Sequence, residues 1–369
     1  MLKRLYAHNY RCFENFEINF DELTLFMGPN GGGKSSLFDL LFNIRMLVID
    51  KAKIESLFPS DDCNAWLTNP QQSFELDVEG MGGRFSYRLA ILHNFELGKQ
   101  RIEQESLTFD GNPLFEFKHG EVRLYNDEHR PGPEYSFDWS VSALATIVER
   151  KDNKKLTWFK KWLEMLFIIR LQPQGMTSTS IEESSWLNRD GSNFADWYRY
   201  ISQEHQDKAF NLTNKLRKCL PGFYAFKLEE AGKKHKNLKV GFGRGEGKEP
   251  IIYFDFEKIS DGQRIILILY SLLMTLQEMG HVLFLDEPDN YVALGEIQPW
   301  LMELQDACGE GLLQAVIISH HPELIDYFGT DHGLWLDRDP LGPTRVKRLS
   351  IGSAQALKLS EQVARGWVE

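Results

Sequence analysis

The sequence lacks the features that mark membrane-spanning and disulfide-stabilised proteins. Its longest apolar stretch, Ile265–Met274, falls short of the about 20 residues that cross a bilayer, and the first residues, MLKRLYAHNYRCF, contain no apolar signal core. The four cysteines are widely scattered and form no C-x-x-C pair. Neither a disulfide framework nor a zinc site is therefore expected. We expect a cytoplasmic protein without a membrane partner.

Positive charges are also fewer than negative ones. The 42 Lys and Arg residues are outnumbered by 53 Asp and Glu, for a net charge of -11, which argues against a surface that is basic overall. Two basic stretches remain, Lys233–Lys239 and Arg150–Lys161, and the second has Trp158, Phe159 and the nearby Trp162 interleaved with its lysines. Such runs are usually solvated helix faces or loops, and a contact to DNA is the alternative.

The most informative segment is Leu25–Ser36, LFMGPNGGGKSS, an apolar run that enters a glycine-rich loop. The glycines let N–H groups turn toward an anion, Lys34 supplies a charge for the β- and γ-phosphates, and the Ser35 hydroxyl is the expected Mg²⁺ ligand. Residues 34–47 are predicted to form a helix whose dipole favours the same phosphates. The segment therefore predicts a nucleoside triphosphate site, contacted by Asn30, Gly31, Gly32, Gly33, Lys34, Ser35 and Ser36.

Two later apolar runs end in polar residues. HVLFLDEP ends in Asp286 and Glu287, of which the first can orient Mg²⁺ and the second can polarise the attacking water. AVIISHHP ends in two histidines, and a histidine there can donate to the γ-phosphate or position the water. His320 is favoured over His321 because it is the first residue after Ser319. An exposed acidic turn and a structural histidine are the alternative interpretations.

The pattern of apolar residues changes along the chain. Alternation predicts two or three short strands in residues 1–27 and an antiparallel meander over 74–125, whereas residues 141–220 have a helical period and resemble an inserted lobe. Strands are then predicted at 224–229, 238–242 and 251–256, around a loop at 243–249. An alternation of strands and helices follows, with helices at 263–279, at 296–307 and from Pro322, and strands at 282–286, 313–319 and 333–337.

This alternation predicts an α/β fold with a mostly parallel sheet and ligands at the carboxyl ends of its strands. We expect three segments. Residues 1–140 carry the phosphate loop and the meander, residues 141–222 form the helical lobe, and residues 223–369 complete the α/β part. The phosphate loop and the last segment are expected to share one domain.

Ser260-Asp261-Gly262-Gln263 opens the helix predicted to begin at Gln263. By itself it is a weak signal, a helix cap, although small residues at a helix N-terminus also offer an anion-binding surface. In order, the segments Gly28–Ser36, Ser260–Gln263, Leu285–Pro288 and Ser319-His320 resemble the ATP-binding-cassette (ABC) ATPases, with S-D-G-Q where S-G-G-Q is usual.

Within that superfamily the chain is similar to the RecF/SMC-type, or OLD-like, ATPases of DNA repair and phage defence. The similarity lies in YAHNYRCFENFEINF before the loop and in Leu187–Phe194, LNRDGSNF. It covers roughly the first 50 and the last 180 residues. It implies an ABC-type ATPase head with an antiparallel β subdomain and an inserted helical lobe. It also implies a head-to-tail homodimer that sandwiches two ATP molecules, in which Ser260, Gly262 and Gln263 touch the γ-phosphate held by the other subunit.

The resemblance implies two further contacts and one departure. Arg11 is expected near the nucleotide, and a glutamine after the strand 167–171 is expected to reach Mg²⁺, for which Gln172 is preferred to Gln174. The segment Asp289–Gly295 lacks the aspartate of the standard D-loop. Communication between the two ATP sites is therefore in doubt.

These patterns favour a slow ATPase whose ATP-dependent dimer acts on DNA, or controls a partner nuclease or effector in anti-phage defence. A RecF-like repair ATPase is the nearest alternative. A nucleotide-binding subunit of a transporter is disfavoured, because the insertion between Lys34 and Ser260 is far longer than such subunits use. No second catalytic motif is visible, so any cutting of nucleic acid would come from another chain.

Overall fold

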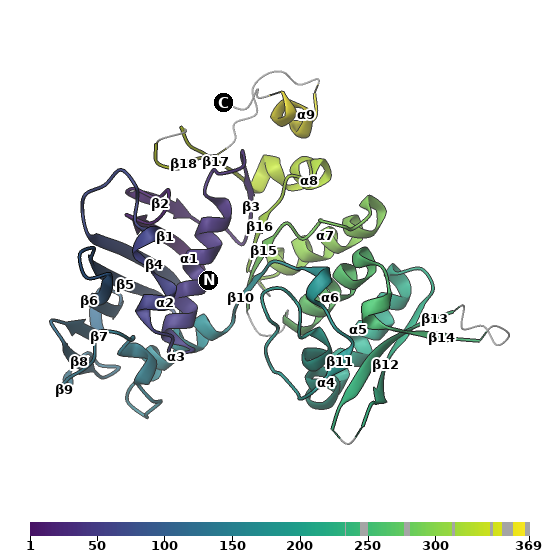
Figure 1. Cartoon of the computed structure of the whole chain (residues 1–369), viewed down its shortest axis with the longest axis horizontal. Coiled ribbons are helices and arrows are strands. Elements are labelled where there is room, and N and C mark those ends of the chain that lie inside the picture. The colour runs from purple at the N-terminus through teal and green to yellow at the C-terminus, as the bar shows by residue number, and fades with distance from the viewer. Residues whose placement is uncertain are drawn as a thin grey trace. The chain divides into compact units, whose positions relative to one another are not determined.

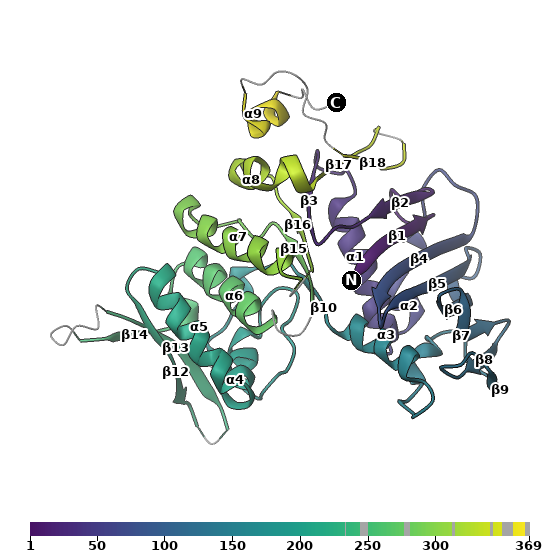
Figure 2. The ribbon, with the colours of Figure 1, turned by 180° about the vertical axis from the view of Figure 1, so that it is seen from behind.

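The computed structural model describes residues 1–232, 234–243, 250–276, 281–311, 314–339, 342–348 and 357–365. The chain divides into two compact units (Figures 1 and 2). Unit 1 comprises Met1–Leu166 and Phe328–Glu369, and unit 2 comprises Phe167–Tyr327. The chain therefore starts unit 1, builds unit 2 and returns to complete unit 1.

An antiparallel sheet of eight strands forms most of unit 1, in the order β2-β1-β4-β5-β6-β7-β8-β9. Its longest strands bury every second side chain, as on β5, where Phe85, Tyr87, Leu89 and Ile91 are buried. This alternation is the pattern from which the meander was predicted, and the meander is confirmed. The strands are β1 (Leu2–His8), β2 (Phe16–Asn19), β4 (Gln71–Gly80), β5 (Gly83–Asn94), β6 (Lys99–Phe109), β7 (Asn112–Lys118), β8 (Glu121–Tyr125) and β9 (Pro131–Ser136).

Unit 1 also contains a parallel strand pair, β3 (Leu23–Met27) and β17 (Gly333–Asp337), in register from Gly333↔Leu25 to Trp335↔Met27. All five residues of β3 are buried. Helix α1 (Lys34–Val48) follows β3 and packs on the helices α2 (Ile54–Leu57) and α3 (Lys154–Glu164). The strand β18 (Arg345–Arg348) pairs antiparallel with β17, and the helix α9 (Leu359–Ala364) follows it.

Unit 2 combines an α/β layer with a small antiparallel sheet. In the α/β layer, β15 (Val282–Asp286) runs parallel to β16 (Gln314–Ile318), with β10 (Leu166–Ile169) beside β15. All five residues of β15 and of β16 are buried, as expected for parallel strands. The small sheet has β13 at its centre, paired with β11, β12 and β14. The remaining elements are β11 (Thr179–Ser180), β12 (Phe223–Glu230), β13 (Lys236–Phe242), β14 (Ile252–Asp255), α4 (Phe194–Glu204), α5 (Gln206–Cys219), α6 (Asp261–Leu276), α7 (Leu294–Gly309) and α8 (Pro322–His332), whose last residues belong to unit 1.

The predicted α/β class is confirmed, with both parallel and antiparallel strands. Some predictions extend beyond the described residues: the loop 243–249 after its first residue, the end of the helix 263–279, Leu313 and Lys233. The described parts of those elements agree with the predicted type, since α6 begins at Asp261 and β16 covers Gln314–Ile318.

The helices of residues 141–222 are divided between the two units. Trp158 on α3 stacks on Phe85 of β5, with ring centroids 4.8 Å apart, and Phe159 stacks on Tyr87 at 5.6 Å. These aromatic contacts hold α3 in unit 1, whereas α4 and α5 belong to unit 2. The predicted segments 1–140, 141–222 and 223–369 stay predictions about domains, and the two compact units are divided at other positions.

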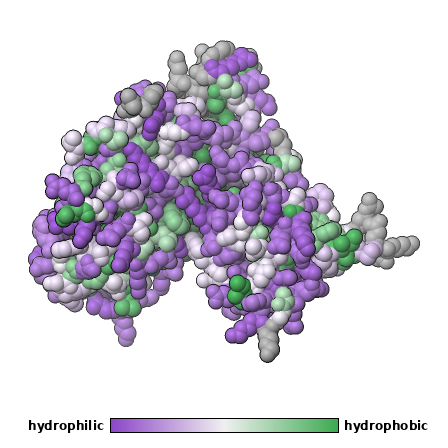
Figure 3. Space-filling view, in the orientation of Figure 1, coloured by the Kyte–Doolittle hydropathy of each residue, from purple (hydrophilic) through white to green (hydrophobic). Residues whose placement is uncertain are grey.

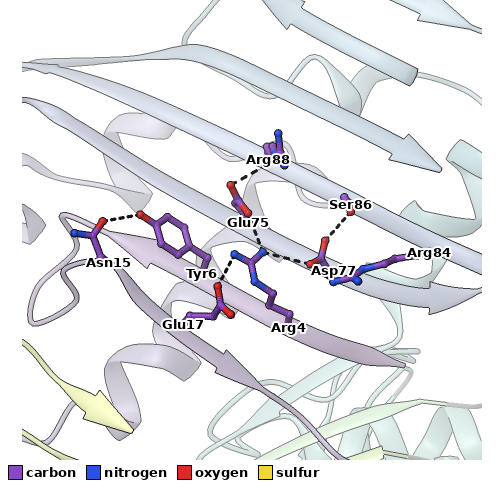
Figure 4. A network of polar contacts seen from close by, with 9 residues as sticks. All are labelled: Arg4, Tyr6, Asn15, Glu17, Glu75, Asp77, Arg84, Ser86 and Arg88. Atoms are coloured by element: carbon purple, nitrogen blue, oxygen red, sulfur yellow. Dashed lines mark hydrogen bonds and ion pairs between the residues drawn. The ribbon is translucent and has the colours of Figure 1, made fainter. Parts of the chain in front are cut away.

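Charged and polar side chains form a network across four strands of the large sheet, β1, β2, β4 and β5 (Figure 4). Arg4 on β1 pairs with Glu17 on β2 at 2.8 Å and with Glu75 on β4 at 2.8 Å. Asp77, also on β4, lies 3.3 Å from Arg4 and accepts a hydrogen bond from Ser86 at 2.6 Å. The network makes this face of the sheet polar, and hydrophilic side chains also cover most of the surface seen in Figure 3.

Candidate functional site

The phosphate loop, residues 28–36, lies in unit 1 between β3 and α1. Gly28, Gly31 and Gly33 have φ values of 133°, 80° and 95°, which L side chains rarely adopt. A Cβ on Gly28 would collide with the carbonyl oxygen of Leu336, and one on Gly32 would lie 2.7 Å from the same oxygen. The loop therefore needs glycine both for its backbone conformation and for its close approach to the end of β17.

Lys34 opens α1, and its side chain is turned back into the loop. Its ammonium donates to the carbonyl oxygens of Gly28 at 2.8 Å and Pro29 at 2.9 Å, and the residue is 6% exposed. Ser35 and Ser36 are half-buried in the first turn of α1, while Asn30 and Gly31 are exposed at the tip of the loop. A buried cation inside a glycine-rich loop at the start of a helix suits an anion with several oxygens, so the residues fit a nucleotide phosphate.

The segment of Arg11 lies beside this loop. A Cβ on Gly33 would approach the Cys12 sulfur to 2.8 Å and the Phe13 ring to 3.1 Å. The Arg11 guanidinium, however, donates to Asp39 of α1 at 2.5 Å and to Asp62 at 2.8 Å. Partial burial by itself lowers the pKa of Arg11, but the Asp62 and Asp39 interactions outweigh it and raise that pKa. The observed role of Arg11 is to tie its segment to α1, and its contact with nucleotide stays a prediction.

The two acids lie in unit 2, where β15 ends. The Asp286 side chain is 2% exposed, and its Oδ2 lies 3.7 Å from Nε of Arg170. Glu287 has a φ of 52° and donates its N–H to the carbonyl of Ile318 at 2.9 Å. Its carboxylate accepts a hydrogen bond from the Asn290 amide at 2.8 Å. The left-handed turn at Glu287 therefore separates the two carboxylates, one buried and one at the surface of the turn.

The end of β16 distinguishes the two histidines. His321 donates its N–H to the Ser319 hydroxyl at 2.9 Å, and its Nδ1 accepts from the N–H of Glu323 at 3.2 Å. That second bond uses the imidazole at the start of α8. His320 is exposed. The preference for His320 over His321 and its catalytic role stay predictions.

Ser260 and Gln263 form a reciprocal cap at the start of α6. The N–H of Gln263 donates to the Ser260 hydroxyl at 3.2 Å, and the N–H of Ser260 donates to Oε1 of Gln263 at 3.3 Å. Gly262 has no room for a side chain, because a Cβ there would collide with the carbonyl oxygen of Tyr291. The signature residues Ser260–Gln263 therefore pack on the loop that follows the two acids.

Gln172, the predicted Mg²⁺ contact, is exposed and donates its N–H to the Asp190 carbonyl at 2.9 Å. From this part of the chain, the residue beside Asp286 is Arg170, which the sequence prediction missed. A signal for it existed in the sequence, since an arginine directly follows the apolar run Leu166–Ile169, which forms β10. A metal contact by Gln172 stays a prediction.

The basic stretch Arg150–Lys161 uses part of its charge internally. The Lys160 ammonium donates to the carbonyl oxygens of Ala145 at 3.1 Å and Ile147 at 2.7 Å, and that of Lys155 donates to the Asp127 carbonyl at 2.8 Å. Trp162 is 1% exposed. Buried aromatic rings and internally bonded lysines are typical of a packed helix, so this stretch gives the DNA hypothesis little support.

The chain matches one family of known proteins over most of its length. A family profile described as "AAA domain, putative AbiEii toxin, Type IV TA system" matches residues 23–326, from β3 to α8. The chain belongs to this family. A search by sequence among curated proteins found no match. Over the described residues, no helix is both long and apolar enough to cross a membrane.

Structural comparison finds SMC head domains among the solved structures that match this chain. The SMC head bound to the C-winged helix domain of ScpA is 12% identical, with a TM-score of 0.57 over 96% of this chain and 99% of that one. The SMC head domain from Thermotoga maritima is 13% identical, with a TM-score of 0.48 over 95% of this chain and 99% of that one. The family and the first of these structures confirm the predicted resemblance at the level of the fold: this AAA-family chain has the fold of an SMC head.

Proposed function

We propose that this AAA-family protein binds ATP with Mg²⁺ and hydrolyses it slowly. The observation that carries the proposal is the phosphate loop, in which three glycines have positive φ and the Lys34 ammonium is held inside the loop by two carbonyl oxygens. A polyphosphate replaces those two weak acceptors with charged oxygens, which Lys34 binds more strongly. Family membership supports nucleotide binding in general terms.

In this proposal different residues bind the phosphates, hold the Mg²⁺, accept the proton from water and contact the nucleotide of a second copy. Lys34 binds the β- and γ-phosphates, with Asn30, the loop glycines and Ser36 around them, and Ser35 and Asp286 would hold the Mg²⁺, which supplies charge neutralisation when bound. Glu287 accepts a proton from the attacking water once its bond to Asn290 is released, and His320 donates to the γ-phosphate. Ser260, Gly262 and Gln263 act on the nucleotide of a second copy of the chain.

A nucleotide-binding measurement tests this assignment. Replacing Lys34 with alanine removes the cation inside the loop, and we expect the affinity for a fluorescent ATP analogue to fall by about a hundredfold or more. Lys118→Ala, which removes an exposed lysine on β7, is the matched control and should bind as the wild type does. Equal affinity of Lys34→Ala and the wild type would contradict the proposal.

We further propose that the ATP-bound homodimer controls a partner effector or nuclease in anti-phage defence, in the cytoplasm. Two findings support control of a protein partner: the family description includes a toxin, and the SMC head was solved with a bound domain of another protein. The four cysteines, all described, form no disulfide, which suits a reducing compartment. Co-purification of the Glu287→Gln protein with its genomic neighbours tests the proposal, and capture that does not depend on ATP would contradict it.

A further inference from the structure

Arg170 and Asp286 form an ion pair within unit 2 that the proposed catalytic scheme does not use. The Arg170 Nε lies 3.7 Å from the Asp286 Oδ2, and the two side chains are 53% and 2% exposed. A carboxylate this deeply buried is costly without a compensating charge. Arg170, which directly follows β10 beside β15, supplies such a charge while its other side faces solvent.

The segment Leu187–Phe194 holds the backbone of Arg170 in place. The N–H of Arg170 donates to the Arg189 carbonyl at 2.7 Å, and the N–H of Gln172 donates to the Asp190 carbonyl at 2.9 Å. These two bonds, two residues apart, align the residues after β10 with the segment. The segment Leu187–Phe194, which carries part of the resemblance to RecF/SMC-type ATPases, therefore fixes the backbone next to the pair Arg170–Asp286.

The segment is itself locked by its own polar groups. Gly191 has a φ of 75°, and a Cβ on it would lie 2.9 Å from a Leu171 methyl carbon. The Asp190 carboxylate accepts the N–H of Ser192 at 2.9 Å, and the Asn193 amide oxygen accepts the N–H of Asn188 at 2.7 Å. A turn with this many internal bonds moves little, so the freedom left to Arg170 is that of its half-exposed side chain.

We propose that Arg170 is a resident counter-ion of Asp286, positioned by Leu187–Phe194, which Mg²⁺ must displace before the site can act. This rests on the proposed role of Asp286 in holding Mg²⁺. A guanidinium and a divalent cation compete for the same carboxylate, because like charges repel at such distances. Arg170 would thus set the Mg²⁺ concentration at which the protein binds Mg-ATP. The neutral Gln172, the predicted Mg²⁺ contact, would not compete with the metal in this way.

The experiment measures binding and not turnover. A fluorescent, non-hydrolysable ATP analogue is titrated with Mg²⁺ in the wild type and in Arg170→Gln, Arg170→Lys and Arg88→Gln proteins. Arg170→Gln is expected to lower the half-saturating Mg²⁺ concentration by about fivefold to tenfold, and this difference should shrink at high salt because Arg170 is half-exposed. Arg170→Lys should lie near the wild type. Arg88→Gln, the matched control, removes an exposed arginine 3.6 Å from Glu75 in unit 1 and should have no effect.

An unchanged or higher half-saturating concentration in Arg170→Gln would overturn the inference. In an Asp286→Asn background, Arg170→Gln should cause no further change, and an additive effect would also overturn it, because the two residues then act separately. A wild type whose analogue binding does not depend on Mg²⁺ would instead refute the metal role of Asp286, and with it the proposed function.

Discussion

At the scale of single residues, the contact between Gly262 and the Tyr291 carbonyl offers a direct test of the signature. Alanine at 262 would push away the loop that follows the acids, since a backbone carbonyl cannot move alone. We expect Gly262→Ala to bind the ATP analogue normally but to lose ATPase turnover by about tenfold or more. Steady-state phosphate release and analogue titration measure the two effects.

The control for that substitution is Gly295→Ala in α7, where a Cβ would meet open space. Alanine is the better helix former by about 1 kcal/mol, so this variant should be as active as the wild type and no less stable. If Gly295→Ala lost as much turnover as Gly262→Ala, the contact with Tyr291 would not be the reason for the loss.

His281, at the start of the strand that carries the acids, makes stability depend on pH. Burial lowers its pKa to about 4, although its bond to the Leu276 carbonyl acts in the other direction. Below its ordinary pKa of about 6.5 the unfolded chain takes up a proton that the folded chain refuses, so stability is lost as the pH falls from about 6.5 toward 4. Urea unfolding should show a loss of about 2 kcal/mol between pH 7 and pH 5 from this residue. His281→Gln should remove that part of the loss, and an identical pH profile in both proteins would contradict the assignment.

The residues of the candidate site differ in how far the sequence reveals them. Lys34 and Asp286 stand in local patterns, a glycine loop before a helix and an acid after a buried strand, so both could be named from the sequence. The pairing of Arg170 with Asp286 could not be predicted, because it depends on β10 lying beside β15. The sequences of these two strands do not determine that they are neighbours. Non-local pairings of this kind require the structure.

At the scale of elements, the period of the hydrophobic residues predicts whether a segment is a helix or a strand more reliably than it predicts what that segment packs against. The strands β4 to β8 were predicted because one face is buried and the other is not. The strand β9 has six exposed residues and therefore no alternation to detect. The helix α3 was predicted as a helix, but its union with unit 1 depends on the rings of Phe85 and Tyr87, far away in the sequence.

The lysines of α3 yield a prediction for this element. The Lys160 ammonium bonds two carbonyl oxygens, and burial lowers its pKa. Lys160→Ala leaves those carbonyls without their donor, so we expect the free energy of unfolding to fall by about 1 to 3 kcal/mol, while DNA affinity stays unchanged. Urea unfolding and fluorescence anisotropy with duplex DNA measure the two quantities. Lys151→Ala, at an exposed position of the same stretch, should change neither, and a weaker DNA affinity in Lys160→Ala would restore the DNA hypothesis.

At the scale of the whole molecule, the main property to measure is the oligomeric state, because the proposed homodimer depends on ATP. Glu287→Gln removes the group that would accept the proton from water while keeping a side chain that can still pair with Asn290. We therefore expect this variant to retain ATP and to elute as a dimer from a sizing column with ATP and Mg²⁺, and as a monomer without them. A Glu287→Gln protein that stays monomeric at saturating ATP would refute the sandwich arrangement.

The pairing of β3 with β17 has a consequence for biosynthesis. The loop glycines Gly28 and Gly32 fit against the carbonyl of Leu336, yet roughly 300 residues separate these partners along the chain. At ordinary rates of translation, a ribosome needs roughly fifteen to sixty seconds to add a stretch of that length. During that interval the nascent chain carries the loop sequence without its supporting strand. If the loop binds nucleotide as proposed, the nucleotide can stabilise the folded loop only in chains whose synthesis has passed β17. It would therefore act late in folding.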